Sequence, residues 1–91
     1  MNTFIVGYDL TRKGSHDYTN LIETLKHSFV NWWHHLDSTW VIVTSKSAQQ
    51  VRDILRAHMH PDDELLVVQS NGTGAWTGFK QAGSDWLRAN L

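Results

Sequence analysis

Asp9 is the residue whose type and position most directly suggest chemistry. It stands near the end of a β-rich run, Asn2–Leu10, and a polar loop containing Arg12 and Lys13 follows it. The loop leads into a helical pattern, and the free N–H groups of a helix N-terminus favour anions. A carboxylate beside such a loop can hold Mg²⁺ or Mn²⁺, because a hard cation of this kind needs only one or two protein carboxylates besides water and phosphate. Asp9 is therefore a candidate catalytic and metal-binding residue, and Arg12 and Lys13 are candidate phosphate-binding residues.

The same carboxylate also has a structural interpretation. An Asp side chain before a loop often accepts hydrogen bonds from nearby groups of its own loop. In that case Asp9 binds Thr11 or Arg12 and only fixes the loop. The sequence leaves both interpretations open.

The segment Trp32–Trp40 (WWHHLDSTW) is the densest group of aromatic and titratable side chains. If Trp32–His35 is a regular strand, side chains alternate between its two faces, so the adjacent histidines cannot both bind one metal ion. A face with one Trp and one His can stack a base, which contributes about 1–3 kcal/mol per base. His34 is a candidate general acid–base. The candidate substrate-binding residues here are Trp32, Trp33, His35, Ser38 and Trp40; each Trp has the alternative role of sealing the core or supporting a dimer contact.

Hydrophobic periodicity predicts the elements that position these residues. Period-2 runs indicate strands, and apolar residues at i, i+3, i+4 and i+7 indicate amphipathic helices. A capping-box pattern opens the second helix at Ser47. The predicted series is a strand at Asn2–Leu10, a helix at Tyr18–Phe29 capped by Ser15 or Asp17, a hairpin from Val30 to Thr44, a helix after Ser47, a buried strand at Glu64–Gln69 and a short helix at Ser84–Leu91.

The order β-α-β-β-α-β predicts an α+β, ferredoxin-like fold: an antiparallel sheet with both helices on one face. We expect one domain over residues 1–91, with a core of about 1–70 and a Trp-rich C-terminal extension of about 71–91. The second face of the sheet must be covered by this extension, by a second subunit, or by both. The pattern therefore favours a homodimer.

Composition narrows the classes of function. The chain has 91 residues, a net charge of −1 and no cysteine, which excludes disulfides, thiolate zinc sites and a Cys nucleophile. Near-zero charge argues against binding long duplex DNA, since such proteins usually carry a clear positive excess. No apolar run is long enough to span a membrane, and the N-terminal segment lacks the features of a signal peptide. We expect a cytoplasmic protein.

Three segments resemble the small CRISPR adaptation subunit family, which is related to the virulence-associated protein D toxins. They are Tyr8–Asp9 at the end of the first strand, Asp37–Val41 in the hairpin and Asp62–Val68 entering the last strand. The segments WWHHLDSTW, AWTGF and WLRANL are still more similar to the SinR-type proteins grouped nearby. The broad resemblance covers about residues 1–70.

The resemblance implies a ferredoxin-like homodimer that cleaves phosphodiesters with Mg²⁺ or Mn²⁺, as an endoribonuclease acting through Asp9 of both subunits. RNA or a small nucleotide is then the substrate, and Tyr8 is among the substrate-binding residues. The chain departs from the family in its net negative charge and in the extension that follows the fourth strand. The alternative is a non-catalytic homo-oligomer that binds a (cyclic) nucleotide signal or a protein partner in phage defence or counter-defence.

Overall fold

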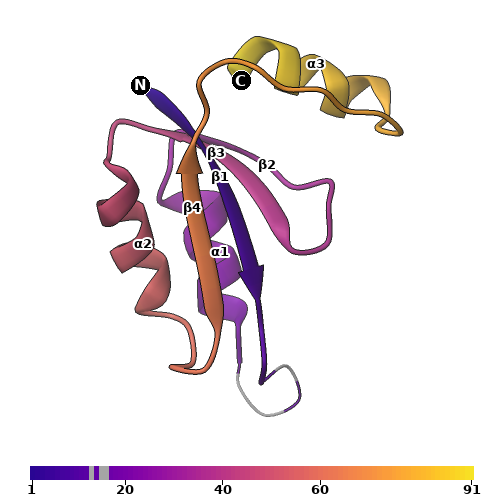
Figure 1. Cartoon of the computed structure of the whole chain (residues 1–91). Coiled ribbons are helices and arrows are strands. Elements are labelled where there is room, and N and C mark those ends of the chain that lie inside the picture. The colour runs from indigo at the N-terminus through magenta and orange to yellow at the C-terminus, as the bar shows by residue number, and fades with distance from the viewer. Residues whose placement is uncertain (13, 15–16) are drawn as a thin grey trace.

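The computed structural model describes residues 1–12, 14 and 17–91 (Figure 1). In this part of the chain a β-α-β-β-α-β series is followed by a C-terminal helix. The elements are β1 (Asn2–Asp9), α1 (Thr19–His27), β2 (Asn31–Trp33), β3 (Thr39–Thr44), α2 (Ala48–Arg56), β4 (Glu64–Gln69) and α3 (Gln81–Asn90). The strands form one antiparallel sheet in the order β2-β3-β1-β4. The prediction of an α+β fold with a four-stranded antiparallel sheet is confirmed.

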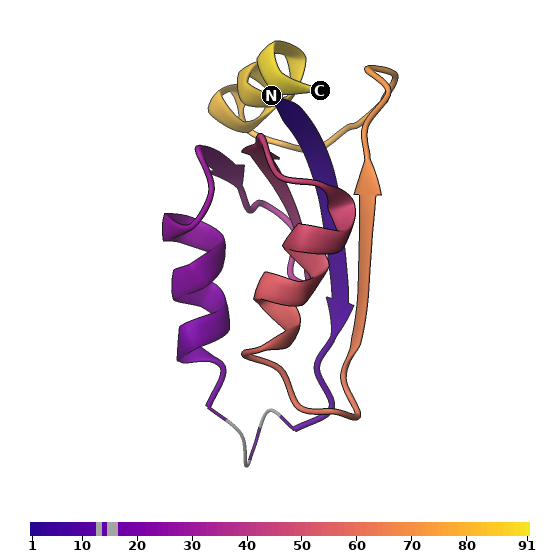
Figure 2. The same cartoon turned by 90° about the vertical axis from the view of Figure 1, so that its left-hand side faces the viewer.

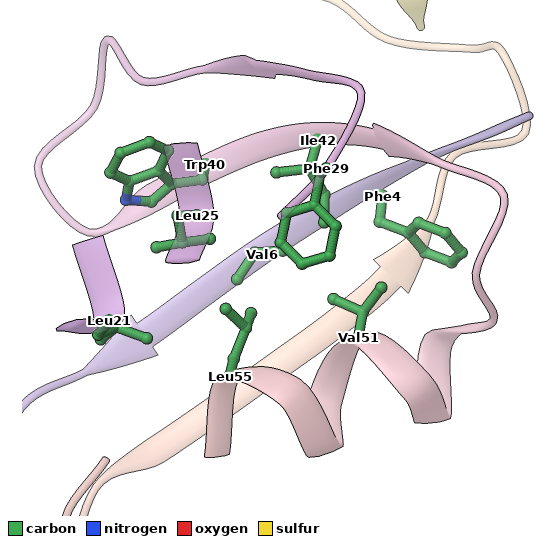
Figure 3. Packing of buried hydrophobic residues seen from close by; sticks show 9 residues of the cluster. All are labelled: Phe4, Val6, Leu21, Leu25, Phe29, Trp40, Ile42, Val51 and Leu55. Carbon is green, nitrogen blue, oxygen red and sulfur yellow. The ribbon is translucent and has the colours of Figure 1, made fainter. Parts of the chain in front are cut away.

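The main core lies between the sheet and helices α1 and α2, which share one face of the sheet (Figure 2). The predicted faces of β1 are correct: Phe4 and Val6 are fully buried on the side of the helices. Burial of apolar area at about 25 cal/mol per Å² makes this layer the principal stabilising contact. Figure 3 shows its residues, which are Phe4, Val6, Leu21, Leu25, Phe29, Trp40, Ile42, Val51 and Leu55.

A second, smaller core covers part of the opposite face. Trp33, Val41 and Leu87 are its buried members, and Ile5 packs against them. Figure 1 shows α3 beside the end of the sheet at which β1 begins. The expectation that the C-terminal extension covers the second face is therefore correct for this end of the sheet.

The remainder of that face is open. The sequence predicts a buried strand at Glu64–Gln69, and this prediction is wrong for its outward side chains: Leu66 is 64% and Val68 46% exposed. The physical reason is that the second core contains residues of β1, β2 and β3 and of the C-terminal extension but none of β4. Of the apolar side chains of β4, Leu65 and Val67 pack against the main core.

The hairpin is shorter than predicted. Strand β2 ends at Trp33, so the expected regular strand Trp32–His35 is wrong in its second half. Only Asn31–Trp33 pair with β3. The predicted alternation still holds, since Trp32 and His34 both contact the ring of Trp40 on one side, whereas His35 contacts Phe79 on the other.

The helix ends follow local hydrogen bonds. At α2 the predicted capping box is present: Gln50 N–H donates to Ser47 Oγ, and Ser47 N–H donates to Gln50 Oε1. Before α1, Asp17 Oδ1 accepts from the backbone N–H of Thr19; Ser15 lies outside the described residues. The C-terminal helix begins three residues earlier than predicted, at Gln81. Across the described chain, no helix has both the length and the apolar character that a membrane span requires.

Candidate functional site

Asp9 ends β1 with an exposed side chain. Among the described residues it makes neither a hydrogen bond nor an ion pair. The interpretation in which Asp9 fixes its own loop does not hold, because the loop donors have other partners. Thr11 donates from its backbone N–H (2.8 Å) and its hydroxyl (2.9 Å) to Asp63 Oδ1, and Arg12 N–H donates to the hydroxyl of Tyr18 (3.3 Å). The carboxylate of Asp9 is thus left available to a ligand.

Asp63, directly before β4, takes the structural role that the sequence had offered to Asp9. It accepts both donors of Thr11, the hydroxyl of Tyr18 at 2.8 Å and the backbone N–H of His60 at 2.9 Å. Burial opposes ionisation of this carboxyl, but these hydrogen bonds outweigh burial and lower its pKa to about 2. Asp63 therefore joins the loop after β1, the start of α1 and the turn before β4.

A cavity of about 390 Å³ opens beside Asp9, between the end of β1, α1 and the loop that joins β2 to β3. Its volume is in the range of small-ligand sites. Four of the residues selected from the sequence line it, namely Tyr8, Asp9, His34 and Ser38. The other lining residues are Leu10, Ile22 and Asp37. These residues meet because β1 pairs with β3, which the β2–β3 loop directly precedes.

His34 is held in one orientation at this cavity. Its ring is stacked on Trp40 with centroids 3.8 Å apart and an interplanar angle of 12°. Its Nε2 lies 3.1 Å from the backbone carbonyl oxygen of Asp37. Because a carbonyl can only accept, Nε2 carries the proton and Nδ1 is the basic nitrogen of the neutral ring. The imidazole therefore has a defined tautomer, as an acid–base group requires.

Tyr8 and Trp40 connect the cavity to the main core. The indole N–H of Trp40 donates to the Tyr8 hydroxyl at 2.9 Å, and Tyr8 N–H donates to the carbonyl oxygen of Ser38 at 3.1 Å. Burial raises the pKa of Tyr8; the Trp40 hydrogen bond opposes this shift and the nearby charge of Asp37 adds to it. Tyr8 is therefore a neutral donor at physiological pH.

Several residues selected from the sequence lie elsewhere. The guanidinium of Arg12 forms an ion pair with Asp62 at 2.6 Å. Trp33 is 4% exposed and donates its indole N–H to the carbonyl oxygen of Gly83, and Trp40 is fully buried, so both serve the cores instead of stacking a base. His35 packs against Trp33 on the α3 side. Lys13 lies outside the described residues.

Trp32 is the member of the aromatic group that a substrate can reach directly. It is 38% exposed, and the Nζ of Lys26 lies 5.7 Å from its ring centroid. Its ring also contacts Trp40, at a centroid distance of 5.4 Å. Trp40 stacks on His34, which lines the cavity. The exposed indole of Trp32, with Lys26 beside it, is therefore connected to the cavity through the buried ring of Trp40.

Asp37 is a site residue that the sequence interpretation did not assign. In the sequence it was noted only as the start of the segment Asp37–Val41, and no local pattern links it to Asp9. Both aspartates line the same cavity, and two carboxylates suit Mg²⁺ or Mn²⁺ when water and phosphate supply the other ligands. No group of three or more His, Cys, Asp or Glu placed to hold a metal occurs within the described residues.

Asp9 also borders a second hollow, of about 350 Å³, on the outer face of the sheet. Its lining includes Gly7 and Leu66, and it ends at Glu64. In the β1–β4 register Asp9 is directly opposite Glu64, and Gly7 is opposite Leu66. The end of β1 thus places one free carboxylate between a cavity on the helix side and an open apolar face.

Comparison with models of protein families, with curated proteins and with solved structures finds no match. The resemblance to the small CRISPR adaptation subunit family stays a prediction.

Proposed function

We propose that this chain forms a homodimer of ferredoxin-like subunits, similar to the small CRISPR adaptation subunits and SinR-type proteins, and cleaves phosphodiester bonds with Mg²⁺ or Mn²⁺. The element order and the strand order β2-β3-β1-β4 support the ferredoxin-like part of this proposal. The observation that carries the function is the carboxylate of Asp9, which has no side-chain partner among the described residues and lies at a cavity that also contains His34. A carboxylate without a structural partner at a concave site is available for a ligand.

Each residue of the cavity has a role in this proposal. Asp9 and Asp37 would hold the metal ion, which would supply positive charge to neutralise the phosphate and a Lewis acid to activate water. His34 accepts or returns a proton through Nδ1, because its Nε2–H is used by the Asp37 carbonyl. Ser38 and Tyr8 are hydroxyl donors for phosphate or ribose oxygens.

RNA or a small nucleotide suits this surface better than long duplex DNA. Trp32 can stack one base, and Lys26 beside it can bind a phosphate. A long duplex requires many phosphate contacts, but the chain has a net charge of −1 and Arg12 is already paired with Asp62. Single-stranded RNA is therefore the preferred substrate class.

A second candidate function is non-catalytic binding of a (cyclic) nucleotide signal, or of a protein partner in phage defence or counter-defence. The observation that favours it is the absence, in the described part of the chain, of a three-ligand metal group. In this case the cavity binds a nucleotide through Tyr8, His34 and Ser38 without turnover.

The decisive experiment uses Asp9→Asn, with Asp85→Asn as the matched control. Asp85 is exposed on α3, so its substitution makes the same change in charge far from the cavity. Cleavage of a labelled single-stranded RNA is measured with Mg²⁺, with Mn²⁺ and with EDTA. We expect Asp9→Asn to lower turnover at least about 100-fold with an unchanged circular dichroism spectrum, whereas Asp85→Asn retains activity.

Wild-type turnover in Asp9→Asn contradicts the catalytic proposal. Calorimetric titration with mononucleotides and cyclic dinucleotides, with and without EDTA, then tests the second candidate. Metal-independent binding without turnover supports a nucleotide-binding module, and absence of both supports a protein-interaction role.

A further inference from the structure

A further cavity, of about 380 Å³, lies between the second half of α2 and the start of β4. Figure 1 shows the turn by which the chain passes from α2 into β4. None of the residues that line this cavity lines the cavity beside Asp9. Its volume is in the range of small-ligand sites, so it can hold a ligand of its own.

Two arginines of this cavity share a single acidic partner. Arg52 and Arg56 are one turn apart on α2, so both side chains lie on the same face of the helix. Both pair with Asp53 Oδ1, which is 3.0 Å from Nε of Arg52 and 3.4 Å from Nη2 of Arg56. In the described part of the chain, Arg12 and Arg88 each pair with an aspartate that no other arginine contacts. The α2 pair therefore has two guanidinium charges against one carboxylate charge.

The two guanidinium groups also keep donors for a ligand. Arg52 donates through Nε to Asp53, and its terminal N–H groups make no hydrogen bond to a described residue. The side chain of Arg56 makes no hydrogen bond within the described part of the chain. One guanidinium is sufficient for a carboxylate, which it binds in a bidentate pair. A phosphomonoester has three acceptor oxygens and a charge of about −1.5 to −2, so two adjacent guanidinium groups suit it better.

Much of the remaining lining is apolar. Met59 and Leu65 pack against the main core and are only partly buried, and Pro61 lies in the turn between them. Small-ligand sites typically combine such apolar surface with a few polar groups that fix the orientation of the ligand. The cavity thus suits a molecule with an anionic end and a ring that packs against apolar side chains.

The other polar groups of the cavity are held by the fold. Asp63 lines it, but its carboxylate accepts hydrogen bonds from Thr11, Tyr18 and His60, which offset its charge. His60 Nδ1 accepts the backbone N–H of Asp62 at 3.1 Å, so Nε2 carries the proton of the neutral ring. Groups that are fixed before a ligand arrives lower the entropic cost of binding.

We propose that this cavity binds a phosphomonoester carried on a ring, of the class of the nucleoside monophosphates. The phosphate lies between Arg52 and Arg56, and the ring packs against Met59 and Leu65. A free phosphate ion uses only the arginines, and a nucleoside uses only the apolar residues, so the joined molecule binds more tightly than either part. This site does not depend on the proposed function, because it contains no residue of the cavity beside Asp9.

The test is a calorimetric titration of the full chain with adenosine monophosphate in EDTA, with inorganic phosphate and adenosine as the two partial ligands. We expect the mononucleotide to bind at least about tenfold more tightly than either part. Arg52→Gln and Arg56→Gln should each raise its dissociation constant at least about tenfold. Arg88→Gln is the matched control, since Arg88 is an exposed arginine of α3 and its substitution makes the same change in charge. Asp9→Asn should bind the mononucleotide like the wild type.

Circular dichroism and urea unfolding verify that each variant is folded. Absence of binding at about 1 mM mononucleotide overturns the proposal, and so does an affinity that neither arginine substitution changes. An equal affinity for inorganic phosphate or for adenosine overturns it as well, because the cavity then does not recognise the joined molecule. Binding that is lost in Asp9→Asn and kept in the arginine variants assigns the nucleotide to the cavity beside Asp9 and also overturns it. Cleavage of RNA is measured separately, so this proposal and the catalytic one can fail independently.

Discussion

Two aspartates lie at the same end of the β1–β4 pair in opposite circumstances. Asp63, just before β4, accepts hydrogen bonds from Thr11, Tyr18 and His60. The side chain of Asp9, at the end of β1, has no hydrogen bond or ion pair with any described residue, and Asp9 lies opposite Glu64. The carboxylate of Asp63 is thus surrounded by hydrogen-bond donors, whereas the carboxylate of Asp9 lies beside another acidic residue.

The difference shows how the fold keeps a carboxylate free. The loop after β1 presents backbone and hydroxyl donors of Thr11. Because Asp63, directly before β4, accepts from them, Asp9 is not needed for this purpose. A side chain that makes no hydrogen bond within the described part of the chain is better explained by a ligand than by stability.

Asp63→Ala is expected to have the largest effect on stability. It removes the acceptor for four donor groups that join three segments, and leaves some of those donors unsatisfied. We expect the free energy of unfolding in urea to fall by about 2–3 kcal/mol. Asp9→Ala, measured in parallel, changes it by less than about 0.5 kcal/mol.

Equal losses in the two variants contradict the comparison, because Asp9 must then have a structural partner. If Asp63→Ala lowers the free energy of unfolding less than Asp9→Ala does, Asp9 and not Asp63 has the structural role. Asp62→Ala serves as a second control. Its carboxylate forms an exposed ion pair with Arg12, and the loss of such a pair has a small effect on the free energy of unfolding.

Most of the fold is predictable from the sequence because its patterns are local. Phe4 and Val6 alternate with Ile5, and this alternation alone assigns them to one face. The exposure of Leu66 and Val68 is not predictable in the same way. An apolar run indicates a strand, but the order in which strands pair decides that β4 lies at an edge.

The candidate site is predictable only in part, for a related reason. Asp9 and His34 are conspicuous in the sequence, and the structure brings both to one cavity. The ion pair of Arg12 with Asp62 spans 50 positions, so no local pattern announces that this cation is occupied. The role of Asp63 was missed because its donors come from three separate segments.

The acid dependence of stability tests the structural role of Asp63 through its pKa. Its hydrogen bonds hold that pKa at about 2 in the folded chain, against an ordinary value of 3.8. A lowered folded-state pKa stabilises the chain above the unfolded pKa, and this contribution is lost as pH falls from about 4 towards 2. Urea unfolding at stepped pH should show a weaker acid dependence in Asp63→Asn than in the wild type.

The alkaline dependence of stability tests Tyr18, whose hydroxyl donates to Asp63. Burial raises the pKa of Tyr18 above 10.0, and the hydrogen bond to Asp63 raises it further. A raised pKa stabilises the folded chain fully below the unfolded value, and the contribution is lost as pH rises through the folded pKa. Stability above about pH 10 should therefore fall less steeply in Tyr18→Phe than in the wild type. An unchanged slope contradicts the raised pKa of Tyr18.

The smallest expected effect concerns Asp9 itself. Like charges directly opposite each other in a sheet are destabilising, and Asp9 faces Glu64 across the β1–β4 pair. Asp9→Asn and Glu64→Gln should each stabilise the metal-free chain by about 0.2–0.5 kcal/mol at low salt, and the double variant should gain less than the sum because either change removes the same repulsion. Added Mg²⁺ should reduce the advantage of the variants, since the wild type alone keeps both carboxylates for the cation. If Asp9→Asn instead weakens the metal-free fold, the carboxylate has a structural partner after all and its availability for chemistry is lost as an argument.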